Sequence, residues 1–215
     1  MNIFSYESKF SQVLLKISYS CWLNVMWTAC SLPVFTIGAS TAALYSVTLK
    51  IADDSEINVT KQFLKAFREN FRQATRIWLI MLGAGLFLLA DMLIVYRLRT
   101  QTAGAAAVMW TLVFAFLIGS CVVYTIILLN IFPLVASVMN TDREMFKNAF
   151  LIGTRYLFSS ITLFAVHMLM LYLIIFIFTP FAIFGEGLCA LLCSYPLLNI
   201  IRICSYLPEQ GERQS

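Results

Sequence analysis

Long apolar runs alternate with short polar segments along this chain. The first run, residues 17–49, carries no charged side chain and is interrupted at 33–38. Four later runs cover residues 77–96, 108–138, 156–178 and 181–203. A helix of about 20 apolar residues is long enough to cross the hydrocarbon core of a bilayer. The pattern therefore predicts an all-α fold, a polytopic membrane helical bundle of about five transmembrane spans that form a single membrane domain, 1–215.

The first run is too long for one crossing and too short for two. Residues 17–49 would form roughly 50 Å of straight helix at about 1.5 Å per residue. One crossing needs about 20 residues, so two need about 40. Pro33 lacks a backbone donor and Gly38 tolerates turn geometry, so we expect the helix to break between them. Segment 33–49 can then span the membrane, re-enter it or lie on its surface, and the side of the N-terminus follows from that choice.

Two polar segments have the alternation of amphipathic helices, at about 59–76 and 141–153. The first places basic side chains on one stripe and aromatic side chains on another: Lys61, Lys65, Arg68, Arg72 and Arg76, and Phe63, Phe67 and Phe71. The second carries Phe146 and Phe150 on its apolar side. Such helices lie on anionic lipid headgroups or dock on the cytoplasmic surface of a partner. We expect these residues to contact a partner or lipid.

Charge adds an orientation to this picture. Segment 50–76 holds six of the 15 Lys and Arg residues, segment 141–155 holds three, and Arg202 and Arg213 lie near the C-terminus. Positively charged loops stay on the cytoplasmic side of a membrane. The prediction is a cytoplasmic C-terminus, two cytoplasmic amphipathic helices, and Arg97 and Arg99 on the outer side.

Composition narrows the class of protein further. Hydrophobic residues make up 60% of the chain and charged residues 12%, whereas soluble domains average about 25% charged residues. The chain has no room for a separate soluble domain, and a net charge of +4 is too small to indicate nucleic acid as a partner. The six Cys form no CxxC pair, and we expect them to be small buried apolar side chains.

Three ionisable residues lie inside the apolar runs: Asp91, His167 and Glu186. Such groups usually face protein or water, because a charge in hydrocarbon is costly. We expect Asp91 and Glu186 to be paired structurally, with Arg97 or Arg99 as partners. The alternatives are a solute or ion pathway and simple exposure of a side chain that snorkels to the membrane surface. For His167 we expect a hydrogen bond to a neighbouring helix in preference to proton transfer.

Catalytic motifs are missing from the sequence. It has no G-x-x-x-x-G-K-[ST], no H-E-x-x-H and no G-x-S-x-G, and its one His cannot supply a His-rich metal site. An intramembrane aspartyl protease needs a second Asp in another span, which Asp91 lacks. We therefore expect no enzyme, no cofactor and no bound metal.

The run Leu23-Asn24-Val25-Met26-Trp27 is followed by Ser31-Leu32-Pro33-Val34, Thr36-Ile37-Gly38-Ala39, Ala42-Ala43-Leu44-Tyr45, Phe63, Phe67, Asn70-Phe71 and Trp78. Over about residues 20–80 this pattern resembles the YesL-like family, small integral membrane proteins of Gram-positive bacteria that form a domain of unknown function. The resemblance implies a multi-pass protein of the bacterial cytoplasmic membrane. Genes of the family are associated with carbohydrate ABC importers, which implies an accessory role in carbohydrate transport. The family supplies no catalytic residues to transfer.

Three functional hypotheses follow. The first is a non-enzymatic accessory subunit that associates with the permease of a carbohydrate ABC importer. The second is a small independent carrier or channel that uses the broken first helix, since discontinuous helices line transport sites. The third is a transient assembly or regulatory factor of the membrane. A homo-oligomer is compatible with each of them.

Overall fold

Every regular element of the protein is helical in the computed structural model, which describes residues 9–177 and 185–212. In chain order the elements are α1 (Lys9–Ser31), the 3-10 turn η1 (Val34–Thr36), α2 (Ile37–Ala52), α3 (Val59–Gln101), α4 (Ala105–Ser137), α5 (Asp142–Arg155), α6 (Leu157–Tyr172), the π-helical turn η2 (Leu173–Ile177) and α7 (Gly185–Glu212). No strand occurs within these residues. The prediction of an all-α membrane bundle is confirmed.

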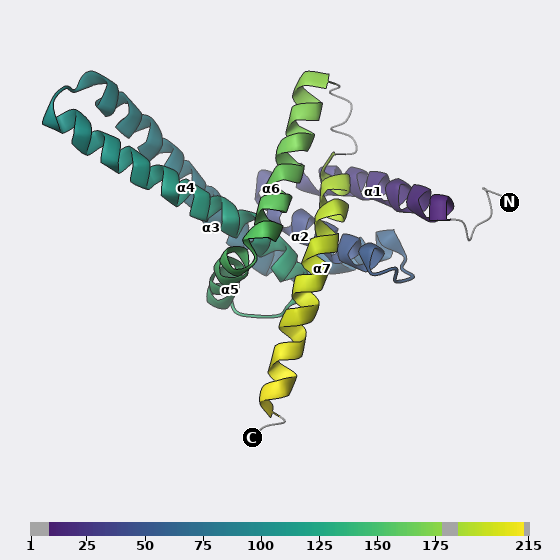
Figure 1. Ribbon diagram of the computed structural model, residues 1–215. Helices are drawn as coiled ribbons and strands as arrows, with labels where there is room; N and C mark the ends of the chain where they lie inside the picture. The colour runs from purple at the N-terminus through teal and green to yellow at the C-terminus, as the bar shows by residue number, and fades with distance from the viewer. Residues whose placement is uncertain (1–8, 178–184, 213–215) are drawn as a thin grey trace.

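The centre of the bundle is α2. It packs against α1, α3, α4 and α7, and most of its side chains are buried. Figure 1 shows how the other helices surround it: α3 and α4 form a long hairpin that projects to the upper left, whereas α6 and α7 run beside one another through the body. The far ends of the hairpin and of α6 point to the same side of the bundle, and α5 and the end of α7 lie toward the opposite side.

The chain leaves the helix after Ser31 and resumes it at Ile37. Pro33 is extended there, and the exposed polar backbone receives partners from the protein. The Thr36 hydroxyl lies 2.6 Å from both the Cys30 and the Pro33 carbonyl oxygens, and the Trp78 indole donates to the Val34 carbonyl at 2.8 Å. Because irregular backbone inside a membrane must be satisfied by protein or water, these bonds make the break stable.

Gly38 has a different role from the one predicted. It lies inside the first turn of α2, not in the break, and a Cβ atom placed there would overlap the Trp78 Cβ and the Ala74 carbonyl oxygen. The absence of a side chain therefore lets α2 approach α3 closely. The expected turn geometry is replaced by a packing requirement.

The amphipathic segment 59–76 and the apolar segment 77–96 form one helix, α3, rather than two elements. Asn58 caps its start by accepting a hydrogen bond from the Lys61 amide at 3.1 Å. No Pro and no Gly occur between Val59 and Leu82, so nothing in the backbone interrupts the helix where its composition changes. The basic stripe is thus rigidly joined to a membrane-crossing helix.

Four helical segments of the described chain are long and apolar enough to cross a membrane, and Gly185–Ile201 is a shorter apolar helix. The four are Val34–Ala52, Val59–Gln101, Ala105–Ser137 and Leu157–Ile177. The predicted boundaries at residue 178 and residues 181–184 lie outside the described residues. Ala52 closes the first of these segments, so the run after the break is itself long enough to span.

Buried polar side chains connect helices that are far apart in sequence. Asn24 on α1 accepts from the Gly187 amide of α7 at 3.0 Å, and the Ser194 hydroxyl of α7 donates to the Thr48 hydroxyl of α2 at 2.9 Å. Interhelical hydrogen bonds and small residues hold membrane helices together, since lipid tails are as apolar as the side chains. These bonds place α1 and α7 on the same side of α2.

Candidate functional site

Two of the three ionisable residues of the apolar runs meet between α6 and α7. The imidazole Nδ1 of His167 lies 2.8 Å from the Leu163 carbonyl, and its Nε2 lies 4.0 Å from the Glu186 carboxylate. Both side chains are mostly buried, with 21% and 29% of their surface exposed. The His167–Glu186 pair is therefore the candidate intramembrane polar site.

Hydrogen-bond chemistry limits the protonation states of this pair. A carbonyl oxygen only accepts, so Nδ1 of His167 carries a proton and donates it to Leu163. The second nitrogen, Nε2, is then an acceptor in the neutral imidazole and a donor in the imidazolium. Nε2 is the nitrogen that faces the Glu186 carboxylate, at a separation beyond direct hydrogen-bond range. Such a pair can bind a proton or a small polar solute.

A small pocket of about 190 Å³ opens beside this pair, and its lining residues come from η2, α6 and α7. They are His167, Met170, Leu171, Ile174, Gly185, Glu186 and Cys189. Apart from the two ionisable groups the wall is apolar or carries the buried, unoxidised thiol of Cys189. In the described part of the chain no three His, Cys, Asp or Glu side chains gather as an ion-binding group.

These contacts correct the expected pairings. Glu186 faces His167 and not Arg97 or Arg99. The hydrogen bond of His167 goes to its own helix, although Nε2 does face the neighbouring one. The two residues are 19 positions apart, and the packing of α6 on α7 brings them together.

Asp91 is half-buried on α3 and forms no ion pair with any other described residue. Arg97 and Arg99 lie six and eight residues farther along the same helix, roughly 9 to 12 Å away along its axis at about 1.5 Å per residue. Arg99 instead stacks over the Phe114 ring at 5.3 Å. The expected pairing of Asp91 is therefore wrong, because a straight helix keeps these groups apart.

The basic stripe of α3 is on the surface of the protein. All five of its members, Lys61, Lys65, Arg68, Arg72 and Arg76, are exposed. Lys65 lies 3.9 Å from Glu69 one helical turn on, and Arg76 pairs with Asp142 of α5 at 3.2 Å. Arg68 and Arg72 form no ion pair within the described residues. The stripe is available to a negatively charged partner over its first four members.

The aromatic side chains of the same helix have another role than the one expected. Phe63 is fully buried, and Phe67 and Phe71 are half-buried against the core. Phe63 stacks on Phe67 at 6.4 Å between ring centroids, and Phe67 meets Phe71 edge-on at 5.4 Å. Phe63 therefore cannot contact a partner, because α3 turns this face toward the bundle. On α5, Phe146 is half-buried and Phe150 is 43% exposed.

One polar cluster was missed by sequence reasoning. The Lys16 ammonium of α1 pairs with Asp54 at 2.6 Å and donates to the Tyr195 hydroxyl of α7 at 3.3 Å. Burial lowers the pKa of Lys16, but the hydrogen bonds to Asp54 and Tyr195 outweigh it and the net pKa is raised. Asp54 and Tyr195 are 38 and 179 positions from Lys16, so no local spacing signals the cluster.

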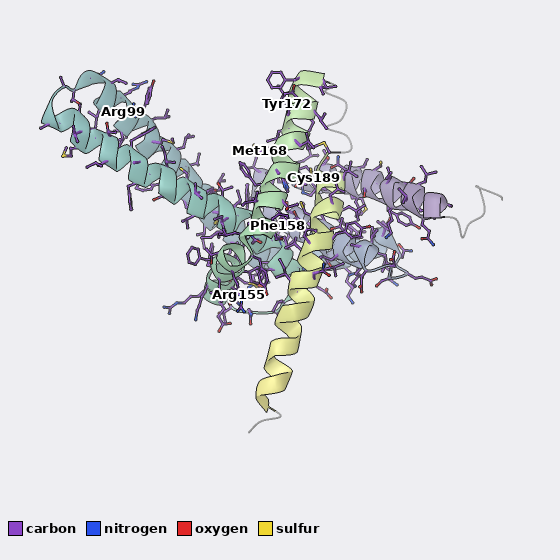
Figure 2. All side chains as sticks on the ribbon, in the orientation of Figure 1. Arg99, Arg155, Phe158, Met168, Tyr172 and Cys189 are labelled. Carbon is purple, nitrogen blue, oxygen red and sulfur yellow. The ribbon has the colours of Figure 1, made fainter. Side chains whose placement is uncertain are left out.

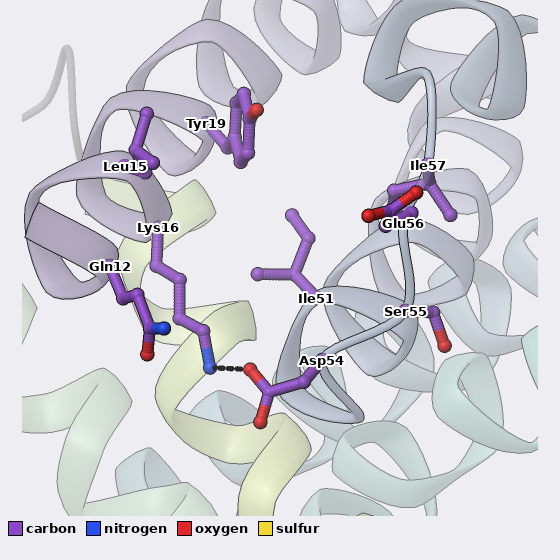
Figure 3. Close-up of a pocket in the computed structure, with 9 residues that line it drawn as sticks. All are labelled: Gln12, Leu15, Lys16, Tyr19, Ile51, Asp54, Ser55, Glu56 and Ile57. Atoms are coloured by element: carbon purple, nitrogen blue, oxygen red, sulfur yellow. Dashed lines mark ion pairs between the residues drawn. The ribbon is translucent and has the colours of Figure 1, made fainter. Parts of the chain in front are cut away.

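Lys16 and Asp54 also line a pocket of about 650 Å³ between α1 and the connection from α2 to α3. Figure 3 shows the ion pair at one wall, with Leu15 and Tyr19 on the α1 side and Glu56 and Ile57 on the opposite side. Glu56 adds a second carboxylate. The pocket is thus amphipathic, and its one cation is already neutralised by Asp54.

Comparisons with known proteins agree with the sequence resemblance. Residues 21–92 match the family described as "Protein of unknown function, DUF624". The chain is 29% identical over 136 residues to the uncharacterized protein YesL of Bacillus subtilis strain 168. This match covers 61% of the chain and 60% of the relative, so the chain matches less than two thirds of that protein's length. No solved structure matches the chain. The resemblance to the YesL-like family is confirmed.

Proposed function

We propose that this YesL-like chain is a non-enzymatic accessory protein of a bacterial cytoplasmic membrane that binds the permease of a carbohydrate ABC importer. The importer is what the family resemblance implies. The observation that carries the docking proposal is the exposed first part of the basic stripe on the solvent-accessible face of α3: Lys61, Lys65, Arg68 and Arg72.

The stripe is built in a way that suits docking. Phe63, Phe67 and Phe71 anchor the same helix in the core, so its cations are presented from a rigid surface. Clustered Lys and Arg residues next to a membrane span attract negatively charged surfaces, and charge complementarity across an interface selects partners. An acidic cytoplasmic surface of a permease has the charge that this stripe would recognise.

Orientation is part of the proposal. The positive-inside rule puts the stripe, α5 and the C-terminal end of α7 in the cytoplasm. A single thiol at Lys65→Cys, in a chain whose other cysteines are replaced by Ser or Ala, should resist a membrane-impermeant maleimide in intact cells. Arg97→Cys in the same background should be labelled. The reverse pattern would place the stripe outside and end the proposal.

The docking test is affinity purification from the native host in mild detergent, with identification of bound proteins. We expect the wild type to recover ABC permease subunits, and Arg68→Glu with Arg72→Glu to recover roughly thirtyfold less, since each reversed charge weakens the attraction by about 1 kcal/mol, or about 2 kcal/mol for the two. Lys50→Glu with Arg97→Glu is the matched control, because both residues are exposed and neither belongs to the stripe. Equal recovery of permease by the two double variants would contradict docking through the stripe.

A second candidate function is a small independent carrier or channel. The His167–Glu186 pair favours it, because ionisable groups inside a membrane often mark solute or proton pathways. Purified protein in liposomes, with a pH-sensitive dye inside, would then show proton flux that Glu186→Gln abolishes and Asp91→Asn keeps.

A third hypothesis, a transient regulatory factor, predicts permease recovery only after chemical crosslinking in cells.

A further inference from the structure

An apolar groove lies between the hairpin and α6. Its volume is about 480 Å³, and its walls are residues 118–129 of α4 and residues 157–164 of α6, with Met92 of α3 at the side. Figure 1 shows α4 and α6 meeting near the foot of α6 and diverging above it. Ile118, Val122 and Ile161 are about half exposed or more, so the groove opens to the surroundings of the bundle.

The chemistry of the walls suits a hydrocarbon chain. Two polar side chains line the groove, and protein groups already occupy both. The Thr125 hydroxyl donates to the Cys121 carbonyl, and the Ser160 hydroxyl donates to the Gly153 carbonyl while accepting from the Asn130 amide. A polar solute would therefore lose hydrogen bonds to water without replacing them.

The size of the groove selects among apolar occupants. A transmembrane helix is about 10–12 Å wide with its side chains and about 30 Å long, so it would fill several times this volume. The stated volume instead falls within the range of pockets for small ligands. The α6 wall rises roughly 10 Å along the helix axis, at about 1.5 Å per residue, which suits part of one acyl chain.

An exposed cation lies close in the chain to the α6 wall of the groove. Arg155 closes α5, two residues before Leu157, which is the first α6 residue of the wall. It is exposed and forms no ion pair with another described residue. Figure 2 shows Arg155 at the foot of α6, with Phe158 above it and Met168 farther up. An added Cβ at the neighbouring Gly153 would overlap Ile126, so α5 joins the groove wall closely.

We propose that this groove binds one anionic phospholipid, with an acyl chain between α4 and α6 and its phosphate at Arg155. Arg pairs with phosphate through charge-assisted hydrogen bonds. The amphipathic α5 lies on the membrane surface in the proposed orientation, which puts Arg155 at the depth of the headgroups. The proposal does not depend on the permease, and the lipid would fix the angle between the hairpin and α6.

Native mass spectrometry of the purified full chain tests the site, with phosphatidylglycerol or phosphatidylcholine titrated into the detergent solution. We expect one phosphatidylglycerol molecule to bind in preference to phosphatidylcholine. Arg155→Gln should weaken phosphatidylglycerol binding roughly fivefold, the effect of removing one basic group near a charged surface. Arg143→Gln on the same helix should not weaken it, because that residue is exposed away from the groove walls.

A second pair of variants, one test and one control, examines the part of the groove that would hold the acyl chain. Ile161→Trp should fill the groove and abolish the single binding event, whereas Leu169→Trp on the same helix should not, since the two residues are 62% and 61% exposed and Leu169 lies outside the walls. Val122→Trp fills the groove from α4 and replaces Ile161→Trp if that variant does not fold. Equal binding by all variants, equal binding of both lipids, or an effect at only the charged or only the apolar position would overturn the proposal.

Discussion

The helix α2 and the hairpin helix α4 are both long and apolar enough to cross a membrane, yet they have opposite surroundings. In the most apolar window of the α2 segment 67% of the residues are buried in protein, whereas in α4 the share is 6%. The mean hydropathy of the α2 segment is the lower of the two. The less hydrophobic helix is therefore the one in the centre of the protein.

The less hydrophobic helix can be central because the surroundings of the bundle are lipid and not water. A soluble protein buries its most apolar helix, but in lipid the surroundings are as apolar as the side chains, and packing decides. The buried face of α2 is rich in small residues, among them Gly38, Ala39 and Ala42. Small residues let the backbones of neighbouring helices approach α2 closely, which favours its central position. The surface of α4 instead carries large exposed aliphatic side chains, which suit contact with lipid.

The largest loss of stability that tests this comparison is expected when a glycine of α2 is replaced by alanine. Gly38→Ala should destabilise the protein by about 1–3 kcal/mol, because its Cβ meets backbone and side-chain atoms of α3 that cannot all move. Gly119→Ala on α4, where an added Cβ meets nothing within 4 Å, should not destabilise the protein, and the higher helix propensity of Ala predicts a gain of about 0.5–1 kcal/mol. Unfolding in mild detergent with added denaturing detergent measures both, and equal losses would contradict the packing role of Gly38.

Removal of the buried hydrogen bond between Asn24 and Gly187 should cause the second-largest loss of stability. Asn24→Ala should cost about 1–2 kcal/mol, because the Gly187 amide loses its side-chain partner and α1 loses a bond to α7. The control is Asn199→Ala, which removes an exposed amide from α7. The same unfolding assay applies, and a loss at Asn199 that matches the one at Asn24 would show that burial is not the cause.

Two acidic residues outside α2 and α4, Asp142 of α5 and Asp91 of α3, give the third effect. Asp142 pairs with Arg76 and accepts from Gln73 at 3.0 Å, so Asp142→Asn should destabilise the junction of α3 and α5 by about 0.5–1 kcal/mol. Asp91→Asn removes an unpaired charge and should not lower stability. Heat-induced aggregation followed by size-exclusion chromatography ranks the two, and a larger loss at Asp91 would reveal a partner in the membrane.

The smallest effect is expected inside the hairpin. The Tyr124 hydroxyl of α4 donates to the Met81 carbonyl of α3 at 3.0 Å. Tyr124→Phe should cost about 0.5 kcal/mol, the usual scale of hydrogen bonds between membrane helices. Tyr96→Phe is the control, because Tyr96 is exposed on the same hairpin and packs on Phe114 through its ring. A loss above about 1 kcal/mol would mean that the hairpin depends on polar contacts as strongly as the core does.

The candidate site could be predicted only in part. Hydropathy singled out His167 and Glu186 as polar residues within apolar runs, because their cost in hydrocarbon makes them stand out. Their pairing depends on how α6 packs on α7, and the cluster of Lys16, Asp54 and Tyr195 depends on three elements meeting. The basic stripe was readable because helical spacing is local, whereas the burial of Phe63 was not.

By itself the sequence determined the class of this protein, its helical character and the basic stripe of α3, because these depend on local composition and on the period of the helix. The tertiary structure decided which apolar helix is central, that Gly38 serves packing and not a turn, and which polar groups meet. Those outcomes depend on contacts between residues far apart in the chain. In lipid, helices that face the bilayer are as apolar as helices buried in protein, so hydropathy does not distinguish the two.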